Sequence, residues 1–159
     1  MQTSYFTPDS LSPDASWRLL RWCAEHGGSE LSLRVFCEAG EPAPIADRFE
    51  DVFAPSLLGE ARRRVLSRAP GETTRTVRLW RLVDDTETLL RAFMPQGLFT
   101  HAVDPRGWLE DPTVYRQGEL MLGVVTHEQE GVLRATADEL RELAALGFAF
   151  QPAGTSITF

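Results

Sequence analysis

The chain has 159 residues, of which 43% are hydrophobic and 25% charged, a composition typical of one globular domain. All 16 basic residues are arginine, so chemistry that needs a Schiff-base lysine or a phosphate-binding Walker lysine is excluded. The formal net charge of −7 disfavours nucleic acid as a partner and favours a basic protein, if the chain has a macromolecular partner at all.

The chain begins without the features of an exported or membrane-anchored protein. Residues 1–9 lack the basic and apolar regions of a signal peptide, and no apolar run approaches the roughly 18 residues of a membrane span. Cys23 and Cys37 stand outside any C-x-x-C pair, so a zinc site built from cysteines is excluded and both are expected to be buried free thiols. We therefore expect a cytoplasmic, bacterial-type protein that makes no contact with a membrane.

The first third of the chain shows one clear helix and one clear strand. The helix is predicted from Ser12, which can cap its free N–H groups, to Gly27, which can end it. Residues 30–37 alternate as a strand, with the odd-numbered apolar side chains on one face and the polar ones on the other. Residues 45–53 stay ambiguous, because Phe49 fits a helical spacing but the segment is short.

The middle of the chain is predicted as helix, strand and helix. Residues 56–68 are expected to form a helix that turns Leu57 and Leu58 inward. Residues 74–83 are read as a strand, with a helix as the alternative because arginine recurs at every third position. Residues 84–95 are expected to form a helix, and a hairpin there is the alternative.

Turn signals and short strands dominate the next segment. Residues 104–107 fit a type I turn, and residues 113–116 fit a short strand. Gln117 and Gly118 are read as a hairpin turn that leads into a strand over residues 119–127. This strand is apolar on both faces, so we place it in the middle of the sheet.

The end of the chain carries the best-defined helix. Thr136 and Glu139 form a capping box, and Gly147 stands where a helix C-terminus commonly has a glycine. A strand over residues 132–135 precedes this helix, and a terminal strand over residues 155–159 follows it.

These elements predict an α+β fold. Helices and short hairpins alternate, which favours a single domain over residues 1–159 with a mainly antiparallel sheet of about four to six strands covered by helices. Residues 1–10 are a candidate flexible N-terminal arm.

His127 and Glu128 are the candidate catalytic pair. They follow the strand placed in the middle of the sheet, where a histidine can act as a base and a carboxylate can orient it. Neighbouring residues of a strand point to opposite faces, however, so the two side chains need not meet, and an ordinary polar turn is the alternative. A zinc-protease helix is excluded, because Gly131 stands where H-E-x-x-H has its second histidine.

His101, Asp104 and His127 are the candidate metal ligands. Two imidazoles and a carboxylate suit a divalent transition metal. Nothing in the sequence brings the segments around residues 101 and 127 together, and Asp104 also fits a structural role as the first residue of a turn. No organic cofactor is predicted.

Trp108, with its acidic neighbours Glu110 and Asp111, is the candidate recognition site. A tryptophan in a loop can anchor an interface, and acidic groups beside it would attract a basic protein partner. The alternative is that the indole covers one end of the core.

Two functions from different classes follow. The first is a small acidic interaction module that docks on a macromolecular partner, with a homo-oligomer as a further possibility. The second is a small hydrolase, with or without a metal, that uses His127 with Glu128. Replacing His127 with alanine should abolish turnover in the second case and leave partner binding intact in the first.

Overall fold

The computed structural model describes residues 4–8, 11–37, 44–66, 74–100, 102–104 and 107–153. The strands are β1 (Ser4–Pro8), β2 (Glu30–Cys37), β3 (Leu57–Arg64), β4 (Thr74–Arg81), β5 (Ala102–Asp104), β6 (Gly107–Arg116), β7 (Glu119–Val125), β8 (Glu130–Ala135) and β9 (Phe150–Pro152). The helices are α1 (Pro13–Glu25), α2 (Pro44–Phe53), α3 (Thr86–Phe93) and α4 (Ala137–Ala145), and two 3-10 turns are η1 (Ala54–Ser56) and η2 (Thr126–Glu128).

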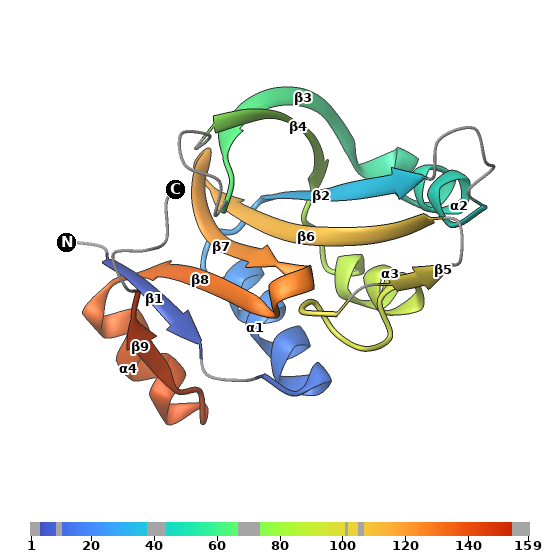
Figure 1. Ribbon diagram of the computed structural model, residues 1–159. Coiled ribbons are helices and arrows are strands. Elements are labelled where there is room, and N and C mark those ends of the chain that lie inside the picture. The colour runs from blue at the N-terminus through green and yellow to red at the C-terminus, as the bar shows by residue number, and fades with distance from the viewer. Residues whose placement is uncertain are drawn as a thin grey trace.

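The strands form one sheet in the order β3-β4-β2-β6-β7-β8-β1-β9, and β5 pairs with the start of β6 (Figure 1). Every pairing among the described strands is antiparallel. The predicted α+β class with an antiparallel sheet is therefore confirmed. The part of the sheet that the structure describes has nine strands instead of the expected four to six, because β1, β3, β5 and β9 add to the predicted set.

The predicted ends of the first and last helices are confirmed. The Ser12 hydroxyl accepts a hydrogen bond from the Ala15 backbone N–H at 3.2 Å, as a helix cap does. At α4, the Thr136 hydroxyl accepts from the Glu139 N–H, and the Glu139 carboxylate accepts from the Thr136 N–H. These caps depend on local sequence alone, which is why the pattern predicts them.

The predicted helix over residues 56–68 is wrong, because residues 57–64 form strand β3 at one edge of the sheet. Leu57 and Leu58, expected inward, are 40% and 44% exposed. Gly59 has a φ of +111° beside a register shift, a backbone state that a helix does not allow. Pairing with β4 outweighs the local helical spacing of the apolar residues.

Three segments whose sequences allow alternatives have definite structures. Residues 44–53 form α2, and residues 74–81 form strand β4, not the alternative helix. Residues 86–93 form α3 as expected. Residues 4–8 lie in the sheet as β1, inside the segment considered as a candidate arm. The predicted strand over residues 155–159 lies outside the described residues.

Strand β7 lies between β6 and β8, as its apolar sequence predicts. Leu122 belongs to the main core on the helical side, whereas Leu120 belongs to a second cluster on the opposite face. The strand ends at Val125, however, two residues earlier than expected. His127 therefore lies in the turn η2 and not on the strand.

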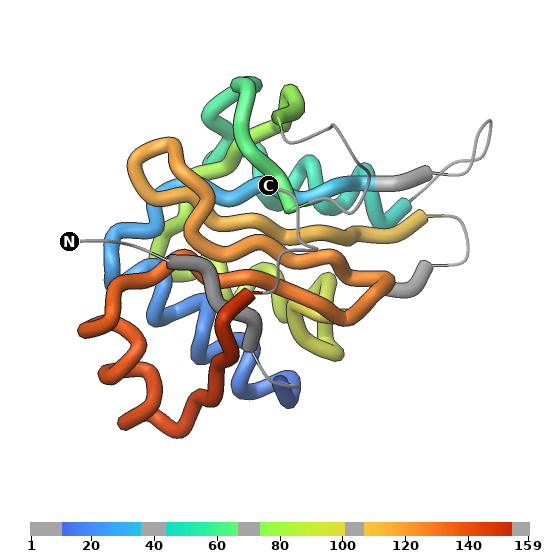
Figure 2. The backbone as a smooth tube through the Cα atoms, turned by 60° about the vertical axis from the view of Figure 1, so that its left-hand side comes forward, coloured from blue at the N-terminus to red at the C-terminus, as the bar shows by residue number. Residues whose placement is uncertain are grey.

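The sheet has one face covered by helices and one face turned inward by its own curvature. On the first face, Trp17 of α1, Phe49 of α2 and Leu90 of α3 pack with the apolar side chains of β2 and β7. On the other face, the β3–β4 hairpin curls over the sheet (Figures 1 and 2). Leu66 approaches β7 so closely that a Cβ at Gly123 would lie 3.1 Å from the Leu66 Cβ. None of the described helices is long and apolar enough to cross a membrane.

Candidate functional site

A β-bulge in β6 brings two consecutive acidic side chains to the same place. Ser32 of β2 pairs with Thr113, but Arg34, two residues on, pairs with Glu110, so β6 has one extra residue. Asp111 occupies the bulge with a φ of +54°. Pro112 follows it, at a position where a strand can accommodate the missing N–H.

Two hydrogen bonds fasten the bulge to the turn after β7. The Asp111 N–H donates to the Thr126 hydroxyl at 2.7 Å, and the Thr126 N–H donates to Asp111 Oδ1 at 2.9 Å. Thr126 is buried, so both bonds are shielded from water. The turn η2 is thereby held against the part of β6 that lies between its pairings with β5 and β7.

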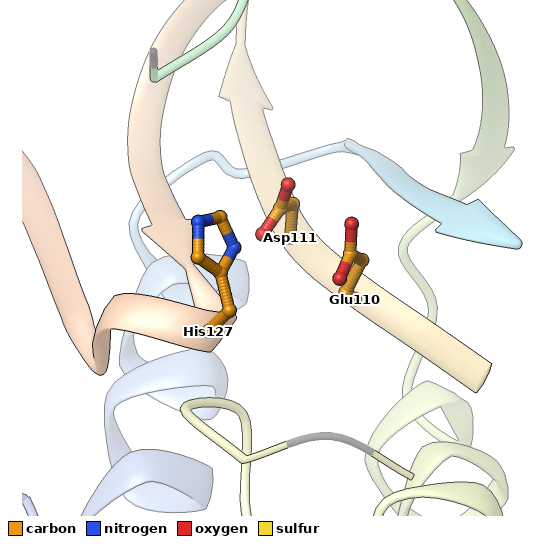
Figure 3. A group of neighbouring side chains, drawn as sticks. All are labelled: Glu110, Asp111 and His127. Carbon is orange, nitrogen blue, oxygen red and sulfur yellow. The ribbon is translucent and has the colours of Figure 1, made fainter. Parts of the chain in front are cut away.

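This junction places Glu110, Asp111 and His127 together, a group that we call the carboxylate–histidine cluster. One potential ligand atom of each residue lies within 4.8 Å of the other two. In Figure 3, the carboxylates project from β6 and the imidazole projects toward them from η2. It is the one group of three such side chains that could hold a metal ion among the described residues.

Arg34 and Trp108 contact the carboxylates of the cluster, and part of the cluster is buried. Arg34 Nη1 lies 3.6 Å from Glu110 Oε1 and 3.5 Å from Asp111 Oδ2. The Trp108 indole N–H donates to Glu110 Oε2 at 3.2 Å. Glu110 is buried, whereas the His127 side chain is 56% exposed, so the cluster opens to solvent on the histidine side.

Glu128 adds a further carboxylate next to the imidazole. Its Oε1 lies 3.7 Å from His127 Nε2. The expectation that these side chains need not meet assumed a strand, and the 3-10 turn brings them together instead. The catalytic roles given to His127 and Glu128 stay predictions.

No family model, curated protein or solved structure matches this chain. Its chemistry must therefore be argued from its own side chains.

The structure describes only some of the side chains that were predicted to bind a metal. His101 lies outside the described residues, and of Asp104 the structure describes the backbone in β5 but not the side chain. His127 does lie in the candidate metal group, but with Glu110 and Asp111, which the sequence analysis assigns to partner recognition. Imidazole and carboxylate together suit manganese, iron or zinc, and three protein ligands leave positions open for water or substrate.

The roles of Arg34 and Thr126 do not follow from the sequence. The alternation of residues 30–37 placed Arg34 on the face opposite the apolar side chains, but no pattern showed which groups it contacts there. Thr126 contacts Asp111 across 15 residues of sequence. The signal that could have indicated the bulge is Asp111-Pro112 between two apolar stretches, because proline within a strand pattern often marks a bulge.

Cys23 offers no alternative nucleophile. Its thiol is fully buried in the helical core, and burial raises its pKa far above the usual range for cysteine. A thiol held in the protonated form is a poor nucleophile and a poor metal ligand.

Proposed function

We propose that this chain is a small metal-dependent hydrolase with the carboxylate–histidine cluster at its catalytic centre. The observation that carries the proposal is the convergence of Glu110, Asp111 and His127 within 4.8 Å. Two carboxylates and one imidazole form a mixed ligand set with open positions, as catalytic metal sites have. The buried bulge fixes Glu110 and Asp111, and η2 supplies the third group from another element.

In the proposed reaction, water adds across an ester bond. The water oxygen bonds to the acyl carbon or the phosphorus, and the bond from that atom to the leaving oxygen breaks. One water proton ends on the leaving alcohol, and the other stays on the acid that is formed. A bound divalent cation supplies a Lewis acid and a more acidic water. The chain would hold the cation through the cluster, and Glu128, whose Oε1 lies 3.7 Å from His127 Nε2, adds a negative charge beside the imidazole.

Calorimetric titration with Mn²⁺ and Zn²⁺ tests the metal site. We expect one saturable site in the wild-type chain, and binding weaker by more than about tenfold in Asp111→Asn and in His127→Ala, because each variant removes a ligand. Asp51→Asn is the matched control, since Asp51 is exposed on α2 and its replacement removes the same charge. Absence of binding in the wild type, or equal weakening in the control, would refute the metal site.

The hydrolase proposal also requires turnover. Phenyl acetate and phenyl phosphate, assayed with and without Mn²⁺, represent acyl and phosphoryl esters. Hydrolysis that depends on Mn²⁺ and is lost in His127→Ala supports the proposal. Metal binding without hydrolysis of either ester class would leave a metal site without the proposed activity.

An interaction module is the second candidate function. Leu57 and Leu58 are 40% and 44% exposed on β3, an edge strand with which another chain could pair. Trp108 supports it less than the sequence predicts, because it lies in strand β6 and not in a loop, and its indole N–H is bonded to Glu110. Under this candidate, Leu58→Ser reduces the association measured by sedimentation, either with a second copy or with a basic partner, and His127→Ala does not. The reverse pattern would exclude it.

A further inference from the structure

A small cavity adjoins the carboxylate–histidine cluster on the inner face of the curled sheet. Its volume is about 180 Å³, and strands β2, β4 and β6 form its walls. Arg34 and Asp111 line this cavity and also take part in the contacts around the cluster, so the two sites are continuous. A substrate group held in the cavity would therefore lie next to the proposed catalytic centre.

The lining of the cavity is suited to an oxyanion. Arg34 and Arg75 enter from two different strands, and Leu66 and Val77 contribute apolar walls. Guanidinium groups bind phosphate and carboxylate through paired N–H donors, and apolar walls strengthen such contacts by excluding water. At roughly 30 Å³ per water molecule, the cavity has room for about six waters, enough for one phosphate or carboxylate group.

We propose that this cavity binds the phosphate or carboxylate group of a small anionic substrate, with Arg34 and Arg75 as its recognition residues. The inference rests on the proposed function, because it names the substrate class of the same site. It also makes a separate claim, since the arginines can bind an anion whether or not the substrate is hydrolysed.

The proposal couples anion binding to cation binding. Arg34 Nη1 lies 3.5 Å from Asp111 Oδ2, longer than a direct charge-assisted hydrogen bond, and its side chain is 47% exposed. Arg34 faces two carboxylates, and a divalent cation bound to them adds two positive charges next to the cavity. A cation at the cluster therefore strengthens anion binding, and by linkage the anion strengthens cation binding to the same degree.

The test titrates methylphosphonate and acetate into the wild-type chain, with and without Mn²⁺. We expect saturable binding of at least one anion, tightened by Mn²⁺, and a loss of about tenfold or more in affinity in Arg75→Gln. Arg62→Gln is the matched control, because Arg62 is exposed on β3 and its replacement removes the same charge. Methylphosphonate and acetate distinguish phosphate from carboxylate specificity.

Failure of this inference is distinguishable from failure of the proposed function. Mn²⁺ binding without binding of either anion overturns the anion cavity and leaves the metal site standing. Anion binding that Mn²⁺ does not change overturns the coupling. If Mn²⁺ does not bind at all, the proposed function fails, and the metal-free titrations of wild-type, Arg75→Gln and Arg62→Gln chains still decide whether the cavity binds anions.

Discussion

Asp111 determines the geometry of the candidate site through its backbone as well as its carboxylate. Its φ of +54° is a left-handed conformation, which costs most residues with a Cβ about 1–2 kcal/mol and which aspartate and asparagine tolerate best. Its Oδ1 accepts the N–H of buried Thr126. Both properties fix the bulge, and neither requires the negative charge, which faces Arg34 Nη1 at 3.5 Å.

Two substitutions at Asp111 separate these contributions. Asp111→Asn is expected to change the free energy of unfolding by less than about 0.5 kcal/mol, because the amide oxygen still accepts the Thr126 N–H and asparagine tolerates the left-handed backbone. Asp111→Ala is expected to lower it by about 2–3 kcal/mol, because a buried donor loses its acceptor and the backbone is strained. Urea unfolding measures both, and equal losses would show that the charge itself stabilises the bulge.

At this scale the sequence predicts the members of the site but not their assembly. It singles out Glu110, Asp111 and His127, and it divides them between two unrelated sites. Their convergence depends on one extra residue in β6 and on a turn that begins at Thr126. Both are consequences of strand register, which residue type and spacing do not specify.

Among the elements, α4 shows how local sequence and packing combine. Glu139 accepts from the Thr136 N–H in the capping box and also pairs with Arg116 of β6. Burial by itself would raise the pKa of the Glu139 carboxyl, but the hydrogen bonds from Arg116 and Thr136 outweigh it, and the pKa lies below its usual value. The cap thus also connects the helix to the sheet.

Replacing the capping residue tests this connection. Thr136→Ala is expected to lower the free energy of unfolding by about 0.5–2 kcal/mol, because the Glu139 N–H loses its acceptor. Thr136→Ser keeps the hydroxyl and should stay within a few tenths of a kcal/mol of wild type, roughly the difference between these two caps. Thermal and urea unfolding measure both, and an equal loss in the serine variant would rule out the cap as the cause.

Strand β3 illustrates where element prediction fails. Residues 56–68 have apolar side chains at helical spacing and arginines that favour a helix. Residues 57–64 nevertheless pair with β4 along the edge of the sheet, where the side chains alternate between partly covered and exposed. The helix α4, by contrast, carries its start signals within four residues, so no distant partner is needed to predict it.

At the scale of the whole molecule, the order of the strands in the sheet brings together residues that lie far apart in the sequence. The apolar pattern of residues 119–125 predicts a central strand, and this is confirmed. The curl that places β3 over β7 is not encoded in any single segment, because it arises from the twist of many paired strands. The inner cavity, with Arg34 and Arg75 on different strands, is a product of that curl.

The interface between α1 and α3 adds a pH-dependent contribution to the stability of the fold. Arg21 of α1 donates two hydrogen bonds to Glu87 of α3, at 2.9 and 2.8 Å, and Arg91 donates to the same carboxylate. These bonds, led by those from Arg21, lower the pKa of Glu87 against the opposing effect of burial. The folded chain therefore keeps Glu87 ionised at a pH where the unfolded chain already protonates it.

The sign of the pH effect follows from this difference. As the pH falls below about 4.3, the usual value for glutamate, the unfolded state binds the proton first, so stability is lost progressively until the lower folded pKa is passed. Glu87→Gln is thus expected to reduce stability at pH 7, with a difference from wild type that shrinks as the pH falls through the lowered pKa and wild-type Glu87 is also protonated. Asp51→Asn, on an exposed site of α2, controls for the loss of one negative charge. Urea unfolding across this pH range measures the effect, and a difference that stays constant with pH would mean that Glu87 stabilises the α1–α3 interface through packing and not through its charge.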